Sequence, residues 1–337
     1  MAISNASEEL FTFPEDEGRH GECGEEWWYL HSHLTTDTGK RFAFVLCYII
    51  SGFKFWILTD LDRARFDSRI WDPDDSPIVA GTGRLELKHD GSFWRSTGDE
   101  FSYRIHEELE SPWNGAVDLD LISNKGAVPM WGGRIKMGRD GQTAWYAHTR
   151  VDISGGISDG DSRYRVEGTG WIDRQWGNWN RMGFGGWKWF SFHLEDGGEI
   201  AAYQQYEPIS GRPMFNLCQT VSPDGRVSVS GEAEVYDLGS WLSPEDEVYS
   251  SGWQVRCGEL GLEMEVRPRF TGQELYKGLW EGACTAKVDL DGRILGGTGF
   301  TELNKGRPAP TWVKYLSYLK AIGTGTMKRT RREARMG

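Results

Sequence analysis

An acidic residue among tryptophans is the feature of this sequence that most suggests chemistry. The stretch GTGWIDRQWGNW, at 168–179, places three tryptophans around a single carboxylate, Asp173. A carboxyl group beside indoles is expected to be poorly solvated, and desolvation raises its pKa because it disfavours the charged form. Asp173 could then keep a proton near neutral pH and act as a general acid. The alternative is structural, in which Asp173 caps a turn and the tryptophans fill a core.

The spacing within this stretch assigns its side chains to two faces. Successive side chains of a strand point to opposite sides. We therefore expect one face to carry Trp171, Asp173 and Gln175, and the other to carry Ile172, Arg174 and Trp176.

Four more residues could take part in proton transfer. Glu26 precedes a pair of tryptophans and could be a second acid. If it pairs with Arg174 instead, its pKa would be lowered. Tyr146 and His148 alternate on one face of a predicted strand and could orient a proton or hydrogen-bond a substrate oxygen. Ordinary strand packing explains these two equally well.

Other motifs give little support for a metal or a cofactor. His31 and His33 would share a strand face, as metal-binding pairs do, but no third ligand has a characteristic spacing, so histidines bonded to the backbone are the simpler interpretation. The WEG triplet at 280–282 is interpreted as structural. No GxSxG elbow, Walker loop or dinucleotide fingerprint is present. We expect no metal and no cofactor.

The composition is typical of an aromatic-rich protein made of strands. The 337 residues include 17 Trp and 44 Gly but 12 Pro, which suits many strands joined by tight turns. Tryptophans in such numbers build apolar cavities, or the core around them, and offer N–H donors to bulky ligands. The net charge of −12 argues against nucleic acid as a partner, because nucleic-acid binding needs a basic surface.

Strand-like segments follow one another along most of the chain. A strand at 25–34, a turn at 37–39 and an apolar strand at 42–50 form a hairpin signal. Helical periodicity is almost absent before residue 305. We predict an all-β fold.

An internal echo indicates two domains. Residues 27–34 (WWYLHSHL) and 187–194 (WKWFSFHL) match at an offset of 160, and GTGWID at 168 resembles GTGFTE at 297. We expect an N-terminal arm at 1–24 across a barrel mouth. Two β-domains are then expected at 25–183 and 184–304, and a helix with a basic tail at 305–337.

The chain also gives signals about its compartment. Its five dispersed cysteines form no CxxC pair, which is typical of free thiols in a reducing compartment. The first ten residues lack the basic and apolar regions of a signal peptide, and the apolar run at 42–58 is better explained by two buried strands than by a membrane span. We expect a soluble, cytoplasmic protein.

The end of the chain differs in charge from the rest. Residues 305–337 contain nine basic residues and one acidic residue, a net charge of +8. Because the whole chain has a net charge of −12, residues 1–304 carry −20. Residues 311–322 show the periodicity of an amphipathic helix. A helix docked on a barrel is the simpler interpretation. The alternative is weak contact with an anionic membrane surface that declines with salt.

Four segments in order resemble one known family. They are EEWWYLHSHL from Glu25, YAHTRVDISG from Tyr146 leading to GTGWIDRQWG, GWKWFSFHLEDG from Gly186, and LWEGAC from Leu279 followed by GTGFTEL. Together they resemble the lipocalin-like carotenoid 1,2-hydratase family, which includes hydroxyneurosporene synthase and kievitone hydratase and, more distantly, fungal Diels–Alderases.

The resemblance implies two tandem lipocalin-like β-barrel domains with an apolar pocket within or between them. It also implies that Asp173 protonates an isoprenoid double bond and that water captures the resulting cation. Arg174 stands where the family often has His, and its charge beside Asp173 would favour the carboxylate. Ala147 replaces a hydroxyl residue that is common in the family. These two differences leave room for an isomerase, a cyclase or a pericyclase.

The expected site therefore has two groups of residues. The catalytic group is Asp173 with Tyr146, His148, Glu26 and Arg174. The residues expected to contact an apolar substrate are Trp27, Trp28, Trp171, Gln175, Trp176, Trp187, Trp189, Tyr203 and Gln205. The predicted function is hydration or cyclisation of a hydrophobic, polyene-like small molecule. The alternatives are a Diels–Alderase-like pericyclase and a non-catalytic carrier of hydrophobic ligands.

Overall fold

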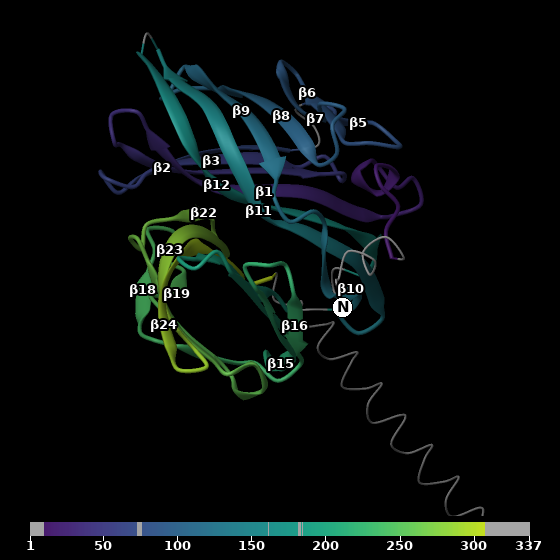
Figure 1. The fold of residues 1–337 in the computed structure, drawn as a ribbon, viewed down its shortest axis with the longest axis vertical. Coiled ribbons are helices and arrows are strands. Elements are labelled where there is room, and N and C mark those ends of the chain that lie inside the picture. Colours follow the sequence, from purple (N-terminus) through teal and green to yellow (C-terminus); the bar gives the residue numbers. More distant parts are fainter. Residues whose placement is uncertain (1–9, 73–75, 161, 181–182, 184, 307–337) are drawn as a thin grey trace, which may run out of the picture.

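The computed structural model describes residues 10–72, 76–160, 162–180, 183 and 185–306. Two large antiparallel sheets of twelve and ten strands, each curled on itself, dominate the described chain (Figure 1). The prediction of an all-β fold with two lipocalin-like barrel domains is confirmed. The predicted hairpin is confirmed as well, since β1 (Glu25–Thr36) pairs with β2 (Arg41–Ile49). The predicted helix at 311–322 and the basic tail lie outside the described residues.

The first sheet follows a short 3-10 turn, η1 (Glu15–Glu17). Its strands after β1 and β2 are β3 (Lys54–Asp60), β4 (Arg65–Trp71), β5 (Val79–Ala80), β6 (Glu86–His89), β7 (Ser92–Ser96), β8 (Ser102–Leu109), β9 (Gly115–Ser123), β10 (Val128–Met137), β11 (Gly141–Asp159) and β12 (Ser162–Asn178). Their order is β4-β3-β2-β1-β12-β11-β9-β8-β7-β6-β5, with β10 paired to β11.

The second sheet repeats this plan. Its strands are β13 (Trp187–Leu194), β14 (Glu199–Tyr206), β15 (Pro213–Val221), β16 (Val227–Ser230), β17 (Glu234–Asp237), β20 (Trp253–Cys257), β21 (Leu262–Pro268), β22 (Glu274–Tyr276), β23 (Leu279–Leu290) and β24 (Arg293–Asn304). Their order is β16-β15-β14-β13-β24-β23-β21-β20-β17, with β22 paired to β23. A small hairpin of β18 (Ser240–Leu242) and β19 (Val248–Ser250) and a 3-10 turn, η3 (Gly258–Leu260), complete the described elements.

The sequence echo corresponds to this structural repeat. The two echoed segments form β1 and β13, and each is the first strand of its sheet and pairs with the last, β12 or β24. Glycine is required where these strands approach. A Cβ on Gly168 would lie 1.9 Å from the backbone oxygen of His33, and one on Gly299 would lie 2.0 Å from that of Ser191. The glycines of both GTG motifs therefore permit the same close pairing of first and last strands.

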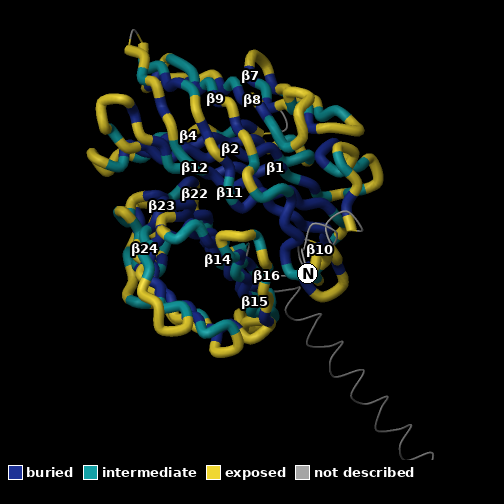
Figure 2. The backbone as a smooth tube through the Cα atoms, in the orientation of Figure 1, coloured by how far each residue is buried: buried dark blue, intermediate teal, exposed yellow. Residues whose placement is uncertain are grey.

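Each barrel is filled by its own side chains, and the two sheets also pack against each other. Alternate side chains of β1, β2 and β12 point into the first barrel, and these include Trp28, Leu30, Phe44 and Ile172. Phe190, Phe192 and Trp253 fill the second. The side chains at the alternate positions of these strands point outward. They form separate apolar clusters, each made of side chains from both sheets. Figure 2 shows the strands along this contact as buried.

An N-terminal arm, residues 10–24, packs against the first sheet. The Trp28 indole donates to the Glu17 carbonyl oxygen at 2.8 Å, and Arg174 donates to the Gly18 carbonyl oxygen. Phe11 and Phe13 each pack their rings 5.2 Å from that of Tyr146. No helix in the described ranges is long and apolar enough to cross a membrane.

Candidate active site between the two sheets

Asp173 is buried where the outer faces of the two sheets meet. Its side chain lies on β12 beside that of Trp171, and Trp145 projects from β11 on the same side. The indole N–H groups of Trp145 and Trp171 donate to Oδ1 of Asp173 at 2.9 and 3.0 Å. Among the described residues, Oδ2 receives no hydrogen bond. One oxygen is thus held as an acceptor, and the other is left to carry a proton.

Burial raises the pKa of Asp173 to about 7, and the hydrogen bonds from Trp171 and Trp145 only partly oppose this rise. The group therefore titrates near neutral pH, as a general acid should.

Two acids from the second sheet extend the site. Glu281 of β23 and Glu302 of β24 are directly opposite each other in the register. The Tyr29 hydroxyl of β1 donates to Oε1 of Glu281, and Oε2 of Glu281 is buried without a partner among the described residues. Burial, together with the charges of Glu302 and Asp173, raises the pKa of Glu281 well above its usual value. Burial also raises the pKa of Glu302 to about 8, although the Trp187 indole opposes it.

Two of the three acids occupy equivalent positions in the two repeats. Asp173 ends the GTGWID motif, and Glu302 ends GTGFTE. His31 and Ser191, which are equivalent in the echo, contact each other at 2.7 Å between Nε2 and Oγ. A contact between equivalent residues is typical of an interface near a two-fold axis. Because both motifs end in an acid, the echo could have identified Glu302. Glu281 belongs to the WEG triplet at 280–282, which is interpreted from its sequence as structural, and the charges of Glu302 and Asp173 act on its buried carboxyl group.

Several of the predicted substrate contacts surround Asp173. The Trp189 ring lies 4.9 Å from that of Trp145 and 6.0 Å from that of Trp171. Gln175 is buried, and its Nε2 has no partner among the described residues. Trp27 and Trp187 are half-buried and lie two residues before Tyr29 and Trp189 on their strands. The Trp187 indole donates a hydrogen bond to Glu302.

Tyr203 and Gln205 belong to the same interface but face β10. The Gln205 amide donates to the Tyr203 hydroxyl at 2.9 Å, and Gln205 Oε1 accepts the backbone N–H of Gly138 at 2.9 Å. In the structure both side chains hold β10 against β14.

The other predicted residues lie on the opposite face of the first sheet. In the register Tyr146 pairs with Arg174 and Ala147 with Asp173, so Tyr146 and His148 point away from Asp173. The Tyr103 hydroxyl lies 2.9 Å from His148 Nε2. Burial lowers the pKa of His148 to about 4. The structure therefore does not place Tyr146 or His148 with Asp173.

Arg174 is also separated from Asp173, which corrects the expectation that its charge weakens the acid. Its guanidinium lies 4.1 Å from the centre of the Trp28 ring and pairs with Glu26. Of the two alternatives for Glu26, the structure shows the pair with Arg174. Burial acts to raise the pKa of Glu26, but the hydrogen bond from His20 and the charge of Arg174 outweigh it and lower the pKa. Glu26 is therefore a carboxylate and a poor proton donor. Trp28 and Trp176 lie on this face too, beside Arg174.

The histidine pair shows no metal geometry. His33 Nε2 lies 3.2 Å from the Gly299 backbone oxygen, and His31 contacts Ser191. Within the described ranges, no group of three or more potential ligands could hold a metal ion.

The pKa of Asp173 predicts how stability depends on pH. A carboxyl whose pKa is 3.8 when unfolded and about 7 when folded stabilises the fold at low pH, and this contribution is lost as pH rises through 7. The free energy of unfolding of Asp173→Asn, relative to the unsubstituted protein, should increase by about 3 kcal/mol between pH 5 and pH 8. Urea unfolding of both proteins at the two pH values measures this difference. A difference that does not change with pH would show that Asp173 ionises normally.

Comparisons with known proteins place the chain in a family. A profile of the AttH-like family matches residues 4–307. No curated protein matches the chain. A protein assigned as AttH from Nitrosomonas europaea is 23% identical with a TM-score of 0.76, and the match covers 88% of this chain and 97% of that one. Kievitone hydratase from Nectria haematococca is 16% identical with a TM-score of 0.74, covering 88% and 93% of the two chains. CghA is 10% identical with a TM-score of 0.51, covering 89% and 97%.

At these identities the likeness to the solved structures shows a shared fold. The predicted resemblance to kievitone hydratase is confirmed at that level, and the resemblance to carotenoid hydratase stays a prediction. Since the family profile spans most of the sequence, the chain belongs to the AttH-like family.

Proposed function

We propose that the protein is a cofactor-independent enzyme that protonates a carbon–carbon double bond of an apolar, isoprenoid- or polyene-like substrate. Asp173 is the general acid, and hydration or cyclisation follows. The observation that carries the proposal is the environment of Asp173. It is buried, two indoles hold one of its oxygens, and its pKa is about 7.

The proposed step begins with proton transfer from Oδ2 of Asp173 to one carbon of the double bond. The other carbon becomes a cation, which the faces of Trp145, Trp171 and Trp189 stabilise by cation–π attraction. Water then adds to the cation and returns a proton to the Asp173 carboxylate, which completes the cycle for a hydratase. In a cyclase, a second double bond of the substrate attacks in place of water, and the new cation then loses a proton from an adjacent carbon to the Asp173 carboxylate.

The neighbouring acids suit this step because burial disfavours their charged forms as well. The pKa values of Glu281 and Glu302 are both raised by burial, to about 8 for Glu302. The unpartnered Oε2 of Glu281 and Nε2 of Gln175 are two buried polar atoms suited to positioning the attacking water. We infer that substrate reaches them past the half-buried Trp27 and Trp187.

The likeness to kievitone hydratase supports hydration by analogy of fold. A pericyclase is the alternative, in which the aromatic walls around Trp189 shape the substrate and proton transfer plays no part. A hydrophobic-ligand carrier is a further alternative.

Isotope labelling separates these possibilities. The purified protein is incubated with an acyclic polyene that has a trisubstituted terminal double bond, in parallel in D₂O and in water enriched in oxygen-18. A hydratase should fix one deuterium on carbon and one oxygen-18 in the product, and a proton-initiated cyclase should fix deuterium alone. Mass spectrometry measures both. A product without either label contradicts proton transfer and favours the pericyclase, and recovery of unchanged polyene from a stable complex favours the carrier.

A further inference from the structure

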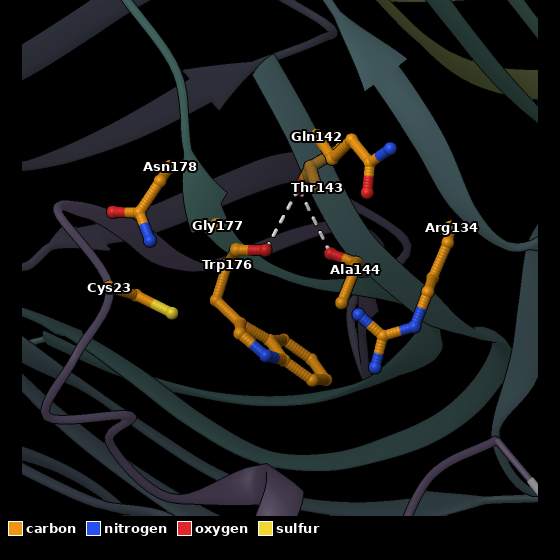
Figure 3. A pocket seen from close by; sticks show the side chains of 8 residues that line it. All are labelled: Cys23, Arg134, Gln142, Thr143, Ala144, Trp176, Gly177 and Asn178. Carbon is orange, nitrogen blue, oxygen red and sulfur yellow. Dashed lines mark hydrogen bonds between the residues drawn. The ribbon is translucent and has the colours of Figure 1, made fainter.

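A cavity of about 240 Å³ lies on the face of the first sheet opposite to Asp173 (Figure 3). Its buried floor is formed by Ala144 of β11 and Trp176 of β12. Cys23 of the N-terminal arm and Arg134 of β10 form its walls. The space holds about eight water molecules, which is the size of a small one-ring compound.

The indole on the floor is held rigidly. The His20 ring stacks on Trp176 with centroids 4.2 Å apart and planes 5° apart. Phe11 and Tyr146 contact the same indole edge-on, at 5.6 and 6.0 Å. A platform fixed before binding loses little entropy when a ligand packs on it.

The cation on the wall has no partner in the described part of the chain. Arg134 is exposed and forms no ion pair or hydrogen bond with any described residue, in a protein of net charge −12. Figure 3 shows its guanidinium pointing across the cavity toward the Trp176 indole. A guanidinium matches a carboxylate in two parallel hydrogen bonds, and an indole favours an apolar or aromatic body.

We propose that this cavity is a binding site for a small planar carboxylate. Arg134 holds the carboxylate, and the apolar body packs against Trp176. The site is separate from Asp173, because Trp176 points to the other side of β12. Its ligand therefore binds apart from the substrate of the proposed reaction.

The thiol in the wall reports occupancy directly. All five cysteines lie in the described part of the chain, and Cys23 is half-buried whereas the other four are buried. Iodoacetamide should therefore label Cys23 first in the folded protein. Burial raises the pKa of this thiol and the charge of Arg134 lowers it, so each variant is compared with its own rate in the absence of ligand.

The experiment measures alkylation of Cys23 by peptide mass spectrometry in the full-length protein, with benzoate or with neutral benzamide at increasing millimolar concentrations. Benzoate should slow labelling in the unsubstituted protein. Its apparent affinity should fall by at least about tenfold in Arg134→Gln, which is the loss of one good charged interaction. Benzamide should protect Cys23 from alkylation only weakly, and equally in the unsubstituted protein and in Arg134→Gln. Arg256→Gln, which removes an exposed arginine paired with Glu263 at 3.0 Å, is the matched control and should behave like the unsubstituted protein.

Three results would overturn the proposal. They are no protection by benzoate in the unsubstituted protein, equal protection by benzoate and benzamide, and undiminished protection in Arg134→Gln. Because Arg134 is exposed, its replacement should not disturb folding, and the comparison of the two ligands needs no variant at all.

Discussion

Replacing Asp173 by asparagine should lower turnover of the polyene in D₂O by about 100- to 10,000-fold, the usual effect of losing a general acid. Asparagine keeps the volume of the side chain and still offers one oxygen to the indoles of Trp145 and Trp171, whose bonds to Oδ1 are 2.9 and 3.0 Å long. It removes the proton that the double bond would receive. The measurement is the rate of deuterium incorporation at pH 7 with the variant shown to be folded by circular dichroism.

Two further variants make this result specific. Asp152→Asn changes an exposed acid on β11 of the same sheet and should leave turnover unchanged. Glu302→Gln removes the equivalent acid of the second repeat and should cost about tenfold or less, since Glu302 is expected to assist and not to donate the proton. Undiminished turnover in Asp173→Asn would eliminate Asp173 as the acid. If Glu302→Gln alone abolished turnover, the proton would come from the second repeat.

Alternation along single strands made part of the site predictable. Trp171, Asp173 and Gln175 share a face as their spacing predicts, and the burial expected for a carboxyl between indoles raises the pKa of Asp173 to about 7. The Glu26–Arg174 pair was one of the alternatives that the residue types suggested for Glu26, and the pairing of β1 with β12 forms it.

The register between strands was not predictable. Whether Tyr146 or Trp145 joins Asp173 depends on how β11 pairs with β12, and a shift of one residue exchanges the two faces. Local sequence does not encode that shift. Here Ala147 lies opposite Asp173, so Trp145 joins the acid and Tyr146 faces the barrel interior.

The packing of one sheet on the other was even less accessible from sequence. Glu281 reaches the site because the outer face of β23 lies against β1, where Tyr29 bonds to it. Nothing in the pattern of β23 distinguishes this acid from one that faces solvent. The echo locates equivalent residues but does not show which faces of the two repeats meet.

Replacing Glu199 by alanine should test what holds those faces together, and it should lower the free energy of unfolding by about 3–5 kcal/mol. The Glu199 carboxylate, on β14, is buried and bonds two cations of the first sheet region. Lys125 Nζ is 2.7 Å from Oε2, and Arg150 Nε is 2.6 Å from Oε1. Alanine leaves both cations largely buried without their anion. The free-energy cost of the two unpaired charges is larger than the net stability that the ion pairs contribute.

Chemical denaturation of the full chain measures this loss, and Glu263→Ala provides its control. Glu263 pairs with Arg256 at 3.0 Å, but both side chains are about half exposed, so its loss should cost at most about 1 kcal/mol. Because Glu199 joins the sheets that bring Glu281 and Glu302 to Asp173, turnover by Glu199→Ala should fall as well, while Glu263→Ala keeps full turnover. If Glu199→Ala were as stable as Glu263→Ala, the ion pairs would not hold the interface, and its strength would have to come from the aromatic contacts of Trp145, Trp171 and Trp189.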